Sequence, residues 1–531
     1  MLRKSKRDPL SMKTNKTRKF GKWRSLFWPV HREELKKFLP MFFMFFFITF
    51  NYNLLRAYKD SMVVTAHNSG AEAIPFIKVW AILPSAILLT FIFTRLANRF
   101  NREKVFYIMM SIFLSFFFIF TFVLYPAQEI LHPHALADKL QLILPEGCKG
   151  FIAIFRNWTF TLFYVMSELW STAIMSVLLW GFTNEVTTVN EAKRFYGLLT
   201  IGANIAGIFS GQAAVYFSGN LFIPWIPYGH NAWDQAIFFL SCTIIISGII
   251  TIGLFRWLNT HVIRPSEKVQ ADGIQPEKFK MSMRKNFAYL ARSKYLVCIA
   301  AIVLSYNLVM NLIEVVWKNQ IKQLYPNPSD YNAYMGEVMT LMAVIATITA
   351  LFITNNVMRR SWTMTALIPA IITLITGLGF FAFIMFQNSS LMWIASFLGT
   401  TPLMLSITFG SLQNSLSRAC KYTLFDATKE IAFIPLSNES KLKGKAAIDG
   451  VGSRIGKSGG SIIHQILLLF FSTVGASTPY IGAIFLIVIV IWILAVLSLG
   501  KQFDALTAQH KKLDIPDAAP QQEPILIKES S

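Results

Sequence analysis

The chain has 531 residues, of which 54% are hydrophobic and only 15% are charged. A soluble protein of this length needs more surface charge, so the composition excludes a soluble globular protein and indicates a membrane protein. The net charge of +22, from 50 basic and 28 acidic residues, would suggest nucleic-acid binding in a soluble protein. In a membrane protein it first indicates basic cytoplasmic loops, so we expect no nucleic-acid partner.

Apolar segments follow one another along the chain. About 18 apolar residues cross the hydrocarbon core of a bilayer, and such a segment satisfies its backbone only as a helix. We therefore predict an all-α membrane protein with twelve transmembrane helices. Their approximate bounds are 39–55, 76–96, 105–125, 151–182, 195–217, 236–257, 295–317, 335–357, 362–386, 391–412, 446–472 and 480–499.

The loops between these segments predict the orientation of the chain. The N-terminal tail from Met1 to Phe38 has thirteen Lys or Arg residues and three acids. It could bind anionic lipid or RNA, but a topological signal is the favoured interpretation. The connections after the second, sixth, eighth and tenth segments are basic as well, whereas the opposite loops have little positive excess. Both termini are therefore expected in the cytoplasm.

Two halves with related motifs are visible in the sequence. Tyr52-Asn53-Leu54 and Tyr306-Asn307-Leu308 lie 254 residues apart, and two further motif pairs follow in the same order. Parallel six-helix repeats are typical of the major facilitator architecture, with pseudo-two-fold symmetry and the substrate between the halves. We predict a basic cytoplasmic tail (1–38), a six-helix bundle (39–258), a cytoplasmic linker (259–294), a second bundle (295–500) and a disordered cytoplasmic tail (501–531).

Charged residues inside membrane helices are costly and are functional candidates by default. Some of them could instead snorkel or pair with each other to fix the packing. In the middle of the fourth segment Glu168 has Met166, Leu169 and Trp170 around it, which makes snorkelling difficult. The candidates are Arg56, Lys59, Asp60, Glu168, Glu314, Asp449, Arg454 and Lys457, with Lys421 and Lys445 flanking the last group. Asn204 joins them because its motif matches the one that contains Arg454.

The sequence Gly456-Lys457-Ser458 resembles part of a nucleotide P-loop, but Val451 stands where that loop needs a glycine. A cluster of cations remains, which suits a substrate with several negative charges because a carrier must compensate those charges in a low-dielectric interior. Glycines of the fifth and eleventh segments are expected to allow close helix packing. No catalytic or metal-binding motif is present, so we expect no enzyme activity, no cofactor and no metal site.

Aromatic side chains near these cations could stack on a base. The candidates are Tyr58, Trp170, Trp180, Tyr196 and Tyr422. Because aromatic residues make up 14% of the chain, a role in packing or in contact with lipid is the favoured interpretation for any single one of them.

Several motifs resemble one known family in order along the chain. They are Leu55-Arg56-Ala57-Tyr58-Lys59-Asp60, Ser167-Glu168-Leu169-Trp170, Glu314-Val315-Val316-Trp317-Lys318, the segment from Lys421 to Glu430, and Lys443 to Asp449 followed by Gly456 to Gly460. These motifs resemble the ATP/ADP translocases of obligate intracellular bacteria and plastids, over roughly Phe38 to Gly500. The resemblance implies a nucleotide antiporter that imports ATP in exchange for ADP and phosphate. It also implies that Lys59, Glu168, Glu314 and Lys457 matter most.

On this basis we expect alternating access between two bundles, in a protein that works as a monomer in a bacterial inner membrane. Lys59, Arg454 and Lys457 would neutralise phosphates, and Arg56, Lys421 and Lys445 are second-rank candidates. Two roles remain open for Glu168 and Glu314, which could bind adenine or ribose, or could pair with lysines in the empty carrier. A proton-coupled importer of other nucleotides or NAD is one alternative function. A lipid-phosphate flippase or a membrane-embedded enzyme is another.

Overall fold

The computed structural model describes residues 28–219, 222–263, 293–353, 361–386, 391–436, 444–445, 448 and 452–513. Within these ranges all regular structure is helical. Ten of the described helices are long and apolar enough to cross a membrane. The prediction of an all-α, multi-pass membrane protein is confirmed, and the count of twelve stays a prediction.

The N-terminal half contains the first set of long helices. They are α2 (Leu35–Val64), α4 (Leu83–Arg99), α5 (Arg102–Ile119), α9 (Trp158–Trp170), α11 (Val189–Ser218) and α12 (Ala232–His261). Shorter helices precede or extend them: η1 (Arg32–Glu34), α3 (Ala73–Phe76), α10 (Trp180–Val186) and the π-helical η2 (Ile77–Ile82), η3 (Phe120–Leu124) and η5 (Ser171–Leu179). Between η3 and α9 lie α6 (Gln128–Leu131), α7 (His134–Ile143), η4 (Glu146–Cys148) and α8 (Lys149–Arg156).

The C-terminal half repeats this organisation. Its long helices are α15 (Lys294–Leu324), α16 (Pro328–Ile348), α18 (Trp362–Met385), α20 (Pro402–Cys420), α23 (Ser453–Phe471) and α24 (Val474–Leu513). The shorter ones are η6 (Thr349–Ile353), α19 (Met392–Phe397), η7 (Lys421–Phe425) and α21 (Asp426–Phe433), of which η6 and η7 are π-helical.

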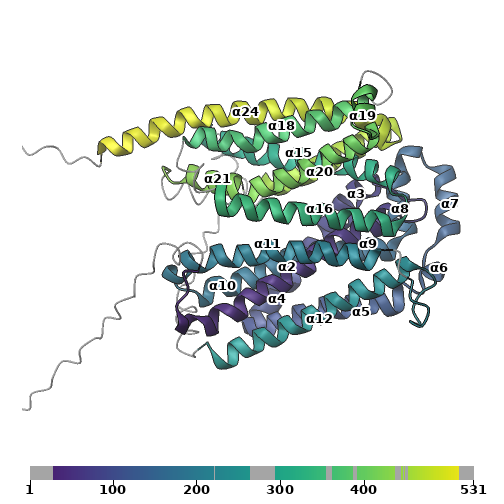
Figure 1. Cartoon of the computed structure of the whole chain (residues 1–531), viewed down its shortest axis with the longest axis horizontal. Helices are drawn as coiled ribbons and strands as arrows, with labels where there is room; N and C mark the ends of the chain where they lie inside the picture. The colour runs from purple at the N-terminus through teal and green to yellow at the C-terminus, as the bar shows by residue number, and fades with distance from the viewer. Residues whose placement is uncertain are drawn as a thin grey trace, which may run out of the picture.

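Corresponding helices pack in the same way in the two halves. Helix α2 contacts α9, α11 and α12, and α15 contacts α20, α23 and α24. The two halves lie one beside the other, and the described ends of α2 and α24 that point to the chain termini are on the same side of the molecule (Figure 1). The pairing agrees with related halves, while the two-fold symmetry itself and the domain limits stay predictions.

The halves approach most closely where α11 packs against α16. A Cβ atom built on Gly211 would lie 2.5 Å from the carbonyl oxygen of Gly336, and one built on Gly336 would lie 2.6 Å from that of Gly211. Both distances are far shorter than a carbon–oxygen contact, so only glycine permits this approach. In this position the predicted glycine stripe is a packing surface.

Two predicted segments differ from the helices observed. The segment 391–412 is interrupted at Gly399, which has a φ of +67°, and α20 begins afresh at Pro402. The side chain of Thr401 accepts a hydrogen bond from the backbone N–H of Met404 at 3.1 Å, and proline is well suited to the first helical turn. The segment 151–182 is likewise broken at Asn157, between α8 and α9.

The tails differ from the prediction as well. Helix α24 continues past position 500 to Leu513, so the expected disordered tail 501–531 begins as a helix. At the other end α2 starts at Leu35, inside the predicted tail 1–38. Residues 1–27 and 514–531 of the predicted tails, and most of the predicted linker 259–294, lie outside the described residues.

Candidate functional site

Lys59 and Asp60 are neighbours on α2, and both are buried. The ammonium of Lys59 is 3.1 Å from the carboxylate of Glu168 on α9 and 3.5 Å from that of Asp60. It also lies 3.6 Å from the centre of the Tyr164 ring. One cation therefore holds two carboxylates of the N-terminal half, and the electron-rich face of a tyrosine adds to its stabilisation.

Glu314 on α15 is the corresponding centre of the C-terminal half. Its carboxylate accepts from Lys318, one helical turn further on, at 2.9 Å and from Lys78 of η2 at 3.1 Å. The guanidinium of Arg418 on α20 is 3.7 Å away. Three cations from three separate elements thus surround one carboxylate.

Two of these ion pairs join the halves. Lys318 of the C-terminal half is 2.8 Å from Asp60 of the N-terminal half, and each side chain is only 1% exposed. Lys78 of the N-terminal half reaches Glu314 of the C-terminal half. We call Lys59, Asp60, Lys78, Glu168, Glu314, Lys318 and Arg418 the charged cluster. Separating the halves here would break both of these buried ion pairs and would take from Asp60 its nearer cation, which costs free energy because the charges stay buried.

A cavity of about 470 Å³ lies in the C-terminal half, against α15, the helix that also contains Glu314 and Lys318. It is lined by Val303, Tyr306 and Asn307 of α15, Lys421 and Phe425 of η7, Asp426, Lys429 and Glu430 of α21, and Lys457 of α23. We call it the cationic cavity because three lysines line it. Its volume falls within the range of about 300–1,000 Å³ that is usual for small-molecule sites.

Lys457 of the cationic cavity and Glu168 of the charged cluster both have open side chains. Lys457 is exposed and makes no ion pair with any described residue. The side chain of Glu168 is 39% exposed although it pairs with Lys59. A cation that has no ion-pair partner in the described part of the chain and a partly open carboxylate are thus available to a ligand.

The structure brings four of the predicted residues into the charged cluster: Lys59, Asp60, Glu168 and Glu314. Two others, Lys421 and Lys457, line the cationic cavity, where Lys421 is 3.0 Å from Asp426. Arg56 is half-buried on α2, and its guanidinium lies 3.9 Å from the sulfur of Met342 on α16.

Four further candidates lie apart from the cluster or outside the described residues. The ammonium of Lys445 contacts the exposed carboxylate of Glu430. Asn204 is half-buried on α11 and makes no hydrogen bond to a described residue. The side chain of Arg454 and the whole of Asp449 lie outside the described residues.

Sequence reasoning overlooked Lys78, Lys318 and Arg418. Lys318 stands four residues after Glu314, and this spacing alone predicts an ion pair on one helix face. Lys78 lies near the predicted start of the second segment (76–96), where a charge can reach water. Arg418 falls after the predicted end of the tenth segment (391–412), and this boundary was wrong because α20 continues to Cys420.

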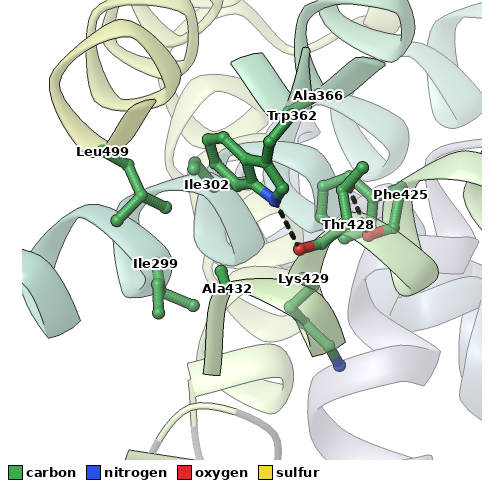
Figure 2. Close-up of a pocket in the computed structure, with 9 residues that line it drawn as sticks. All are labelled: Ile299, Ile302, Trp362, Ala366, Phe425, Thr428, Lys429, Ala432 and Leu499. Atoms are coloured by element: carbon green, nitrogen blue, oxygen red, sulfur yellow. Dashed lines mark hydrogen bonds between the residues drawn. The ribbon is translucent and has the colours of Figure 1, made fainter. Parts of the chain in front are cut away.

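A second, smaller pocket lies between α15, α18, α21 and α24 (Figure 2). Its volume of about 10 Å³ suits a single water molecule. The indole N–H of Trp362 donates to the backbone carbonyl of Thr428 at 3.0 Å, as Figure 2 shows. This contact fixes α21 against α18, and the pocket is too small for a nucleotide.

A known protein family matches most of the chain. The model of the family described as TLC ATP/ADP transporter matches residues 13–503. The chain belongs to this family. Because its members are transporters, the prediction that the protein is not an enzyme is confirmed, as is the resemblance drawn from the motifs. Within the described residues no group of His, Cys, Asp or Glu could hold a metal ion.

Relatives in the TLC family cover most of the chain. ADP,ATP carrier protein 1 of Chlamydia trachomatis is 45% identical over 503 residues, which is 94% of each chain. The chloroplastic ADP,ATP carrier protein 1 of Arabidopsis thaliana is 41% identical over 90% of this chain and 75% of its own. A solved D-xylose-proton symporter matches with a TM-score of 0.49 and 13% identity, over 88% of this chain and 97% of that one.

Proposed function

We propose that this TLC family member exchanges ATP for ADP across a membrane by alternating access between its two halves. The observation that carries the proposal is the charged cluster, in which buried ion pairs join the halves, together with a cavity lined by lysines in the C-terminal half. ATP and ADP have several negative charges, and a carrier needs fixed cations to bring them into a low-dielectric interior. The names of the relatives support the same substrates.

Glu168 and Glu314 act as locks in the empty carrier. Glu168 holds Lys59, and Glu314 holds Lys318 and Lys78. The phosphates of a nucleotide compete with these carboxylates for the same cations. Once the phosphates have replaced the carboxylates, the ion pairs between the halves weaken and the carrier can reorient. This arrangement favours exchange because an empty carrier would have to break the pairs without compensation.

The predicted topology indicates on which side of the membrane the two halves are held together in this structure. The cytoplasmic N-terminus is followed by α2, so Lys59 and Asp60 lie toward its outer end, and Glu314 and Lys318 lie toward the outer end of α15. The charged cluster then closes the extracytoplasmic side, while Lys457 and Lys421 face the cytoplasmic side. Export of phosphate together with ADP, action as a monomer, and a bacterial inner membrane with both termini in the cytoplasm are parts of this proposal.

Transport by reconstituted protein tests the proposal. Labelled ATP should enter ADP-loaded vesicles, and Lys59→Ala and Glu314→Gln should each reduce the initial rate at least tenfold, since each removes one member of a lock. If both variants keep the wild-type rate, the assignment of these residues is wrong. A proton ionophore separates the proton-coupled alternative, because exchange should continue when the pH gradient is abolished.

A further inference from the structure

The charged cluster and the cationic cavity account for the phosphates of a nucleotide but not for its base. A base is recognised by an aromatic ring that lies open beside the phosphate site. Of the five aromatic candidates from the sequence, Tyr58 and Trp170 are fully buried. The indole of Trp170 donates to the backbone carbonyl of Ile48 at 3.2 Å. Neither ring has a free face for a ligand.

Trp180 and Tyr196 are engaged with each other. Their ring centres are 5.3 Å apart, and Trp180 also packs edge-on against Phe45 at 4.9 Å. The hydroxyl of Tyr196 donates to the side-chain oxygen of Asn184 at 2.5 Å. Both rings are thus held in contacts within the N-terminal half.

Tyr422 differs from the other four. Its side chain is 58% exposed, and its hydroxyl makes no hydrogen bond to a described residue. The ammonium of Lys421 lies 4.6 Å from the centre of the ring and covers one face. Since more than half of the side chain remains open, the opposite face is accessible.

Tyr422 lies next to the cationic cavity. The ammonium of its neighbour Lys421 lies 4.6 Å from the centre of the ring, and Lys421 lines the cavity together with Lys457. Lys421 also pairs with Asp426, another residue of the lining, at 3.0 Å. An open ring therefore adjoins the cations that suit phosphates.

We propose that Tyr422 is the stacking platform for the purine base of the transported nucleotide, an inference that rests on the proposed function. The base lies on the open face of the ring, with the ammonium of Lys421 on the other. The π-helical turn of η7 supports this placement because such turns often redirect side chains at functional sites. Stacking of a base on an aromatic side chain contributes on the order of tenfold or more in affinity.

Competition with a ligand that lacks a base tests the platform. Uptake of labelled ATP into ADP-loaded vesicles is inhibited by unlabelled ATP and by inorganic tripolyphosphate. In Tyr422→Leu the concentration of ATP for half-inhibition should rise roughly tenfold, while that of tripolyphosphate should stay within twofold. Tyr422→Phe keeps the ring and should restore the ATP affinity. Tyr196→Leu, at a ring outside the site, is the matched control.

A binding measurement keeps this test separate from the test of transport. Purified full-length protein is heated with ATP, tripolyphosphate or neither, and stabilisation by each ligand is recorded. Wild type should be stabilised at lower concentrations of ATP than of tripolyphosphate, and Tyr422→Leu should lose this difference while tripolyphosphate still stabilises it. Equal weakening for both ligands, or an unchanged preference for ATP, would overturn the proposal. Failure of wild type to exchange ATP for ADP would refute the proposed function instead.

Discussion

Lys318 and Asp60 are partners whose charges can be removed singly or together. In Lys318→Met the buried Asp60 keeps only Lys59, at 3.5 Å, and we expect a loss of about 3–5 kcal/mol in stability. The double variant Lys318→Met with Asp60→Asn should recover most of it, because no unpaired charge is left. Thermal unfolding in detergent measures both. Lys445→Met, at a side chain that is 45% exposed, is the control and should change stability little.

Some residues of the charged cluster can be predicted from the sequence and others cannot. The free-energy cost of a charge inside a membrane helix is enough to predict Lys59, Asp60, Glu168 and Glu314 as candidates. Their position within apolar segments is visible in the sequence without knowledge of the tertiary structure. Their partners were harder to find, since pairing across the halves depends on how α2 and α15 meet. Arg418 was missed for a different reason. The last turns of α20 are rich in Gln, Asn and Ser residues that are buried against other helices. Because these residues are polar, a prediction from hydropathy ends the membrane helix before them.

At the scale of elements, Gly211 lies where α11 and α16 are closest. In Gly211→Ala the new methyl group would lie 2.2 Å from the hydroxyl of Thr340, so the helices must separate, at a cost of about 1–3 kcal/mol. Gly197, on the same helix, has no neighbour within 4 Å of its built Cβ. Gly197→Ala should therefore be neutral or slightly stabilising. Thermal unfolding of the two variants compares them, and equal losses would contradict the close approach.

His132 lies between α6 and α7, at the end of the molecule opposite the termini (Figure 1), and it makes the stability of this region depend on pH. Burial lowers the pKa of His132 from 6.5 to about 4, and the nearby His134 adds to this. Its Nε2 atom is 2.6 Å from the hydroxyl oxygen of Thr159. As pH falls from 6.5 to 4 the unfolded chain binds a proton that the folded chain does not, so stability falls by up to about 3 kcal/mol.

Unfolding between pH 7 and pH 4 measures this effect of His132. Wild type should lose thermal stability over that range, and His132→Gln should flatten the part of the loss that lies between pH 6.5 and 4. His230→Gln, at an exposed loop position, should leave the profile as it is. If His132→Gln leaves the profile unchanged, His132 does not cause the loss of stability between pH 6.5 and 4.

For the whole molecule, the closed side can be fixed by a cross-link between the halves. The hydroxyl of Ser61 on α2 donates to the side-chain oxygen of Asn332 on α16 at 3.0 Å. Cysteines at these two positions, in a chain whose four native cysteines are replaced, should form a disulfide in the empty protein. Oxidation should then stop exchange, and reduction should restore it.

The control for this cross-link lies within one half. Thr373 on α18 and Ser417 on α20 are hydrogen-bonded at 2.9 Å, and cysteines there join two helices that move together. Their oxidation should leave exchange intact. If both disulfides stop exchange equally, or if neither does, relative motion of the halves is not the transport step.

The dependence of ATP uptake on internal ADP tests the central claim most directly. Wild-type protein is reconstituted into vesicles that contain either ADP or no nucleotide, and the entry of labelled ATP is followed. The buried ion pairs of the charged cluster predict rapid entry with ADP inside and almost none without it, since the empty carrier must break them to return. Equal uptake into both kinds of vesicle would contradict ATP/ADP exchange.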